Sequence, residues 1–290
     1  MSSLDEGPHD ESVSSWDSTE DQVSELRSLQ DLTIIESFSP GTTVPKHTTF
    51  YHITSDERLY FGQTSRNKKE LTLQEFRHAL ERIPDEEVYP NIPSQPPLTI
   101  APDSIDQPTY IKRPGLNSFE DMRGTPFVPK EILQETLIME QISQTVHPNI
   151  IRYYGCRTRR GRICAIVLEE LEQTLSQFIL TTEFDTLDRT KFADGIESAI
   201  EYLHSLGLAH NDLNPDNIMV RRGKNDEIQP VLIDFGSCQP YGKPLDSLGT
   251  VGWYDKPFFH SELEHDTFGL AKLRRWLEKP EWGSAFDLHC

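Results

Sequence analysis

The chain has 290 residues, a formal charge of −19 at pH 7 and 36% hydrophobic residues. This charge argues against nucleic acid and membrane as partners, because both bind through clustered Lys and Arg. No run of about eighteen apolar residues occurs, and the acidic start does not resemble a signal peptide, so we expect a cytoplasmic or nuclear monomer.

The first 45 residues contain ten acidic residues and one basic residue, with many serines and almost no apolar periodicity. Such a stretch buries too little apolar surface to offset the entropy of ordering it. We therefore expect residues 1–45 to form a disordered acidic tail.

Residues 46–90 are expected to form a small strand-strand-helix unit. The runs 49–53 and 58–61 are rich in aromatic and β-branched residues and flank a Ser-Asp-Glu turn, which predicts a strand pair. Thr72 and Glu75 form a capping box, which predicts the start of a short helix.

The segment from Tyr89 to Pro108 is rich in Pro and Asp and predicts a linker, or a wrap over the part that follows. Apolar patterns beyond it predict strands at 109–112, 151–156 and 163–168 and helices at about 128–144, 173–181 and 188–206. This order fits a strand-rich lobe at 91–172 followed by a helical lobe at 173–290.

Three polar residues carry the clearest chemical signal. Asp212 and Asn217 lie five residues apart, and Asp234 follows the apolar run 231–233 on a Phe-Gly turn. An apolar strand that ends in Asp-Phe-Gly could be an ordinary turn, but the two pieces together form the set needed for phosphoryl transfer. We interpret Asp212 as the base for an attacking hydroxyl, and Asn217 and Asp234 as ligands of a metal ion between phosphates.

These residues resemble two motifs of the protein kinase superfamily. HNDLNPDNIM at 210–219 resembles the catalytic loop, and IDFG at 233–236 resembles the Asp-Phe-Gly motif. With GTVGWYDKP at 249–257 they are similar to a group of small kinase-like proteins of filamentous fungi. The resemblance covers roughly residues 98–280. It implies a two-lobed α+β kinase-like fold with ATP and Mg²⁺ as cofactors, and with a shortened C-terminal lobe because the chain ends 24 residues after Asp266.

The resemblance places Lys112 on the strand that carries the phosphate-binding lysine, with Glu135 on a following helix as its partner. Glu131 and Glu140 lie on the same predicted helix, so the sequence leaves open which of these glutamates faces Lys112. Lys112 precedes Arg113, so a solvated strand end is the alternative.

Other roles also follow from the resemblance. Main-chain groups of Glu169 and Leu171 would hold the adenine of ATP at the hinge. Asp266 would anchor the backbone of the catalytic loop. His210 is expected to pack under that loop without acid–base chemistry, and Asp216 is expected to be exposed.

The chain also departs from the kinase pattern. No Gly-rich loop precedes Lys112, Asn211 replaces the usual arginine, and Asn214 replaces the lysine that steadies the γ-phosphate. Lys256-Pro257 stands where Pro-Glu is usual, whereas Thr250 matches the threonine that contacts the catalytic loop.

Three functions compete at this point. The first is an ATP-dependent serine/threonine kinase acting on a protein hydroxyl. It is favoured because Lys112, Asp212, Asn217 and Asp234 are all present. The second is a pseudokinase that serves as a binding module. The third is a small-molecule phosphotransferase of the aminoglycoside or choline kinase type, although no helical insertion that would form its acceptor pocket follows the hinge.

Overall fold

The computed structural model describes residues 25–39, 42, 44–117, 119–223, 227–246 and 248–280. The chain divides into two compact units, Met1–Arg82 and Ile83–Cys290. None of the helices among the described residues is long and apolar enough to cross a membrane.

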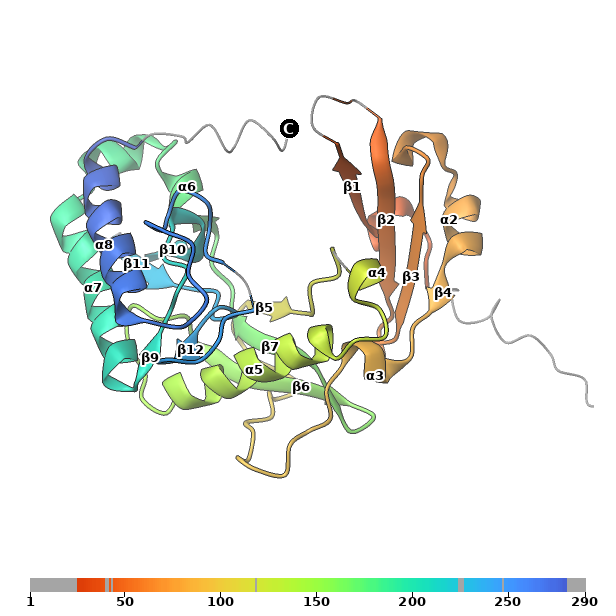
Figure 1. Ribbon diagram of the computed structural model, residues 1–290, viewed down its shortest axis with the longest axis horizontal. Helices are drawn as coiled ribbons and strands as arrows, with labels where there is room; N and C mark the ends of the chain where they lie inside the picture. The colour runs from red at the N-terminus through yellow and green to blue at the C-terminus, as the bar shows by residue number, and fades with distance from the viewer. Residues whose placement is uncertain are drawn as a thin grey trace, which may run out of the picture. The chain divides into compact units, whose positions relative to one another are not determined.

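The first unit is built on an antiparallel sheet with the strand order β1-β2-β3-β4 (Figure 1). Its strands are β1 (Thr33–Phe38), β2 (Pro45–Ile53), β3 (Leu59–Thr64) and β4 (Glu81–Arg82), with short 3-10 turns at Leu29–Asp31 and Lys68–Glu70. The predicted pairing of 49–53 with 58–61 is confirmed, because Tyr51 lies opposite Phe61 and Ile53 opposite Leu59.

Helix α2 (Leu73–Ala79) closes the core of this unit. The predicted capping box forms, since Glu75 N donates to Thr72 Oγ1 and Thr72 N donates to the Glu75 carboxylate. The Phe76 ring packs edge-on against Phe50, with ring centroids 4.8 Å apart, and Leu26 is fully buried beside them.

The expectation of a disordered tail up to residue 45 is wrong for its described part. Strand β1 pairs along β2, and Leu32 and Leu26 join the core of the first unit. The acidic residues of this stretch lie among short apolar stretches, and pairing with a neighbouring strand orders them despite the charge. The expectation for residues 1–24 lies outside the described residues.

The second unit begins with a three-stranded antiparallel sheet of order β5-β7-β6 (Figure 1). Its strands are β5 (Thr109–Lys112), β6 (Tyr153–Arg159) and β7 (Arg162–Glu169). Helix α5 (Phe127–Ile142) packs on this sheet, and the short helices α3 (Asp85–Val88) and α4 (Phe119–Met122) pack on α5. The strands and the long helix therefore fall within a few residues of the predicted positions.

The boundary between the units lies at 82/83, and not at the predicted 90/91. Helix α3 belongs to the second unit because Asp85 forms an ion pair with Arg160, at 2.5 Å, in the β6–β7 turn. The segment after α3 wraps along β6, where Cys156 N donates to Thr99 O at 2.8 Å. Gly155, with φ of 126°, permits this approach, because a Cβ there would lie 2.6 Å from Thr99 O.

Helices dominate the remainder of the unit. They are α6 (Leu175–Phe178), α7 (Arg189–Ser205) and α8 (Leu263–Glu278), with 3-10 turns at Thr182–Thr186 and Pro215–Asn217. Helices α7 and α8 lie side by side (Figure 1). The helix predicted at 173–181 is shorter, because residues 173–174 form a strand and the Thr174 hydroxyl caps the turn that follows.

Two small sheets support the loops between these helices. One contains β8 (Gln173–Thr174), β10 (Ile218–Arg222) and β11 (Ile228–Leu232), and the other contains β9 (Leu208–Ala209) and β12 (Gln239–Pro240). One buried core runs from α5 and the β5-β7-β6 sheet through α7 to α8. The strand predicted at 231–233 is present, whereas its partner β10 was not predicted.

Candidate active site

A lysine and two carboxylates meet between the sheet and the helical part. Lys112 Nζ lies 2.6 Å from Glu135 Oε1 on α5 and 2.9 Å from Asp234 Oδ1, which follows β11. Three segments far apart in sequence thus converge on one ammonium group. Lys112 is three-quarters buried, so the alternative of a solvated strand end is wrong.

The ion pairs set the protonation of this cluster. Burial disfavours the charged ammonium, but Glu135 and Asp234 outweigh it and raise the pKa of Lys112. Burial also opposes ionisation of Asp234, but Lys112 and the Gly236 amide outweigh it and lower the pKa of Asp234. Lys112 therefore remains a cation, and Asp234 an anion, at neutral pH.

The structure resolves which glutamate of α5 faces Lys112. Glu135 is buried and contacts the lysine, whereas Glu140 accepts hydrogen bonds from Thr99 N and Tyr153 Oη at 2.6 and 2.8 Å. Glu131 lines the hollow in front of the pair. Glu140 thus fixes the wrapping segment, and Glu135 fixes the lysine.

Asp266 holds the main chain of the loop that follows β9, at His210 and Asn211. This buried carboxylate of α8 accepts hydrogen bonds from His210 N and Asn211 N, both at 2.8 Å, and contacts His204 Nε2 at 2.9 Å. The predicted anchoring by Asp266 is confirmed. His210 is fully buried beside Phe235, and its Nε2 donates to a main-chain carbonyl, as expected for a packing role.

Asn211 connects the loop to later parts of the chain. Its amide donates to the carbonyls of Ala209 and Ser237 and to Ser261 Oγ, at 2.9–3.0 Å, and its oxygen contacts His265 Nδ1 at 3.1 Å. Its φ of 65° is a left-handed conformation that Asn adopts more readily than most residues. The residue in the arginine position is therefore a buried structural amide.

The contacts of Asn211 with Ser261 and His265 were not predicted. These partners lie 50 and 54 residues further along the chain, so no local pattern connects them. The GTVGWYDKP motif at 249–257 is the nearest feature of the sequence that we had singled out, and it ends before Ser261. Only the fold shows that His265 and Ser261 support the loop that contains Asn211 and Asp212.

Asp212 is held by three donors. Its Oδ1 accepts from Thr250 N at 2.7 Å and from Asn214 Nδ2 at 3.1 Å, and its Oδ2 accepts from Asn217 Nδ2 at 2.9 Å. Asn214 also donates to Thr250 Oγ1 at 3.0 Å, which confirms the predicted contact of Thr250 with this loop. Asn214 thus orients the carboxylate with a neutral amide where a lysine would bring a charge.

The residues expected to bind metal offer suitable donor atoms. The Asn217 amide nitrogen is directed to Asp212, which leaves its oxygen as the atom for a cation. Asp234 supplies a half-exposed carboxylate, with φ of 59° in the turn. Carboxylate and amide oxygens suit Mg²⁺, which also uses water and substrate phosphates as ligands. No cluster of three or more His, Cys, Asp or Glu side chains that could bind a metal is found among the described residues.

The hinge residues are connected by main-chain bonds. Glu169 lies opposite Thr109 at the end of β7, and its amide donates to Arg152 O at 3.0 Å. Its side chain pairs with Arg221 on β10, a residue that we did not predict. Leu171 is half-buried and packs against the main core.

A hollow of about 180 Å³ lies directly at the lysine. Lys112, Glu135 and Asp234 line it, together with Pro114 and Gly115 beyond the end of β5. In the described part of the sheet β5 is an edge strand, so no strand pair covers it from the other side. This arrangement agrees with the absence of a Gly-rich loop in the sequence.

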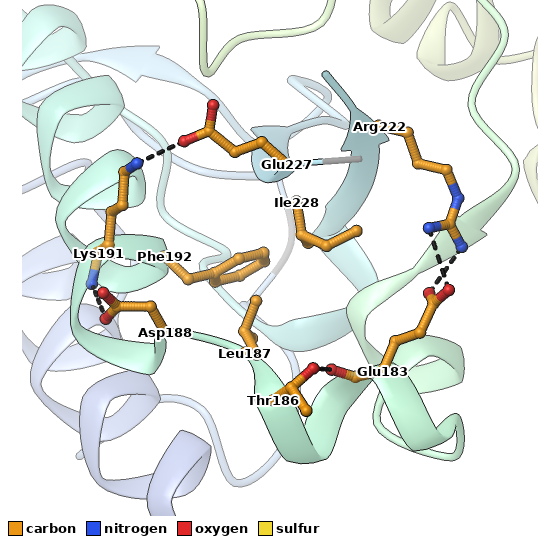
Figure 2. Close-up of a pocket in the computed structure, with 9 residues that line it drawn as sticks. All are labelled: Glu183, Thr186, Leu187, Asp188, Lys191, Phe192, Arg222, Glu227 and Ile228. Atoms are coloured by element: carbon orange, nitrogen blue, oxygen red, sulfur yellow. Dashed lines mark hydrogen bonds and ion pairs between the residues drawn. The ribbon is translucent and has the colours of Figure 1, made fainter. Parts of the chain in front are cut away.

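A larger hollow of about 690 Å³ lies between the start of α7 and the β10–β11 hairpin. Figure 2 shows Lys191 paired with Glu227 on one side of it and Arg222 paired with Glu183 on the other, around Phe192. Its lining includes no residue for which the sequence predicted chemistry. The larger hollow is thus separate from the candidate active site.

The comparisons with known proteins agree with this arrangement. Residues 115–257 match the family model of the protein kinase domain. The fold is α+β and protein kinase-like, with the lysine and Asp234 between its sheet and its helices.

The relatives are similar to this chain over part of their length. Human serine/threonine-protein kinase/endoribonuclease IRE2 is 26% identical over 226 residues, which cover 70% of this chain and 23% of that protein. Hypocrea jecorina serine/threonine-protein kinase/endoribonuclease IRE1 is 33% identical over 37% of this chain and 10% of that protein. Schizosaccharomyces pombe serine/threonine-protein kinase ppk8 is 32% identical over 40% of this chain and 22% of that protein. The chain thus spans less than a quarter of each of these relatives.

Proposed function

We propose that this chain is an ATP-dependent serine/threonine protein kinase. The observation that carries the proposal is the convergence of Lys112, Glu135 and Asp234, with Asp212 held in a fixed orientation on the neighbouring loop. Phosphoryl transfer needs positioned charges more than covalent chemistry. The names of the relatives, which are serine/threonine kinases, agree with it.

Each residue has a defined task in this proposal. Lys112, oriented by Glu135, binds the α- and β-phosphates of ATP. Asn217 and Asp234 would hold Mg²⁺, which would neutralise phosphate charge when bound. Main-chain groups of Glu169 and Leu171 hold the adenine.

Asp212 accepts the proton of the acceptor hydroxyl. The hydroxyl oxygen then forms a bond to the γ-phosphorus while the bond from that phosphorus to the bridging oxygen breaks. ADP leaves with the electron pair of the broken bond, and Asp212 passes its proton to solvent. The carboxylate is pre-oriented for this step by Thr250 N and Asn217.

A pseudokinase is the second candidate, and two observations favour it. Strand β5 has no covering strand pair among the described residues, and Asn214 brings no charge to the γ-phosphate. A binding module would retain the fold and the ion pairs without transferring phosphate.

Asp212→Asn separates the two candidates. Asp212 contacts the acceptor hydroxyl and not the nucleotide, so the substitution should leave the Mg-ATP thermal shift unchanged. It should lower phosphate transfer by roughly 10²–10⁴, the effect of losing a general base. Transfer is measured on a Ser/Thr peptide library, a casein-like protein and a panel of amino alcohols. Equal background for the wild type and the variant on every acceptor would contradict the kinase proposal, and transfer confined to amino alcohols would favour the small-molecule enzyme.

A further inference from the structure

The larger hollow, of about 690 Å³, has an apolar lining between its charged walls. Phe192 is buried there, and Leu187 and Ile228 are half-buried. All three belong to the main core of the second unit or pack against it. The hollow is therefore backed by a fixed apolar surface, and its volume lies within the range of ligand pockets.

The charges around this hollow are already balanced. Lys191 is paired with Glu227 on one side, and Arg222 is paired with Glu183 at 2.7 Å on the other (Figure 2). A charged ligand would gain little here, because it would have to displace an existing partner. An aromatic side chain needs no such exchange, since its face attracts Lys and Arg, and an indole N–H can donate to a carboxylate. The hollow thus suits an aromatic occupant.

The end of α8 lies at the start of α7, which borders the hollow. His204, near the end of α7, contacts Asp266, near the start of α8, at 2.9 Å. Arg274, near the end of α8, pairs with Asp194, near the start of α7, at 2.7 Å. The two helices therefore run antiparallel, and the chain that follows α8 begins at the end of α7 that carries the hollow.

The segment 281–290, which lies outside the described residues, contains the apolar side chains Trp282, Phe286 and Leu288. Helix α8 ends before it, because Pro280 cannot continue the helix. Ten residues span up to about 35 Å, whereas a helix with its side chains is only about 10–12 Å across. The segment is thus long enough to pass around the start of α7 and reach the hollow.

We propose that segment 281–290 docks in the larger hollow of its own chain, with the ring of Trp282 or Phe286 against Leu187 and Ile228. A docked aromatic side chain removes about 150–250 Å² of its own surface from water. It also covers the half-buried apolar groups of the hollow, which favours docking further. The inference does not depend on the proposed function.

The methyl signals of Leu187 and Ile228 in NMR spectra of the full chain report on the occupant. A ring against these methyl groups shifts their signals, so Trp282→Ala/Phe286→Ala should move both. The signals of Leu208 should not move, because Leu208 lies beyond the other end of α7, roughly 25 Å away.

The matched control is Tyr110→Ala/Phe259→Ala, which removes two exposed rings of the same unit elsewhere and should leave both methyl signals in place. The reciprocal variant is Ile228→Thr, which keeps a β-branched residue in the strand and makes the hollow more polar. It should move the indole N–H signal of Trp282, which is assigned by its loss in Trp282→Ala.

Thermal unfolding gives a second measurement. Trp282→Ala/Phe286→Ala should lower the transition of the second unit by about 2–6 °C, the shift expected when one aromatic contact is lost. The same substitutions should cost less in the Ile228→Thr background, because residues in contact are not additive.

Two results would overturn the proposal. The first is that the methyl signals of Leu187 and Ile228 are the same in the wild type and in Trp282→Ala/Phe286→Ala. The second is that they differ only at high protein concentration, which would make a second copy of the chain the occupant. A difference that is constant between about 20 and about 200 µM protein supports docking within one chain, because dimer formation depends on concentration.

Discussion

At the scale of single residues, the candidate site depends on charges that balance one another. Lys112 remains protonated because two carboxylates face it, and Asp234 remains ionised because Lys112 and the Gly236 amide face it. Removing any one charge leaves a partly buried partner unbalanced. The effect of a substitution here therefore reports on the cluster as a whole.

Asp234→Asn tests the proposed metal site. Oxygen donors from Asp234 and Asn217 should make nucleotide binding depend on a divalent ion. ATP should then stabilise the wild type only with Mg²⁺, by about 2.7 kcal/mol at a hundredfold excess over Kd, and the variant should lose this increment. Thermal shift with Mg-ATP and with ATP plus EDTA measures both. An equal ATP-induced thermal shift with Mg²⁺ and with EDTA would show that Asp234 and Asn217 do not bind a metal ion.

Asn211 allows backbone and hydrogen-bond effects to be separated. Asn211→Ala removes a buried amide with three donor contacts and places alanine at φ of 65°, so it should destabilise the second unit by about 1–3 kcal/mol through the lost bonds, and further through strain. Asn211→Gly loses the same bonds without the strain and should be the milder change. Denaturant unfolding of both variants checks this order, and equal stability of the glycine variant and the wild type would show that the amide contacts contribute nothing.

At the scale of elements, local signals predicted most of what formed. The capping box at Thr72 and Glu75 identified the start of α2, and alternation and apolar runs identified β2, β3, β5 and β7. Strand β1 was missed because composition over 45 residues concealed a six-residue strand. Strand β10 was missed because it is defined by its antiparallel pairing with β11, and neither segment alone indicates that pairing.

The capping box predicts how the stability of the first unit depends on pH. The Arg66 side chain, followed by Thr72, lowers the pKa of Glu75 from 4.5 to about 2. A carboxylate with a depressed pKa stabilises the fold above pH 4.5, and this contribution is lost as the pH falls through 2. Glu75→Gln should therefore be less stable than the wild type at pH 7 and equally stable near pH 2. Unfolding of both proteins across this range is the measurement, with Glu70→Gln as a control that leaves the box intact, and a constant difference at all pH values would contradict the assignment.

At the scale of the whole molecule, the sequence suggested an acidic tail, a small unit at 46–90 and two lobes from residue 91, whereas the contacts divide the chain into two units at 82/83. Composition changed near residue 90, whereas the contacts that decide membership, such as Asp85 with Arg160, connect residues 75 positions apart. Asp212, Asn217 and Asp234 could be singled out from the sequence because they lie in short motifs, and their roles stay predictions. The side chains that support the loop of Asn211 could not be predicted in this way. Ser261 and His265 lie 50 and 54 residues beyond Asn211 and contact it only in the folded chain.

Two compact units predict two unfolding transitions, because separate cores need not unfold together. Phe76 is fully buried in the first unit, so Phe76→Ala should lower only that unit's transition, with a cost of about 3–5 kcal/mol. Mg-ATP should raise only the transition of the second unit, which contains Lys112, Asp212 and Asp234. Differential scanning calorimetry of the wild type and the variant, each with and without Mg-ATP, resolves the two effects. A single transition that both perturbations move together would show that the units fold as one cooperative body.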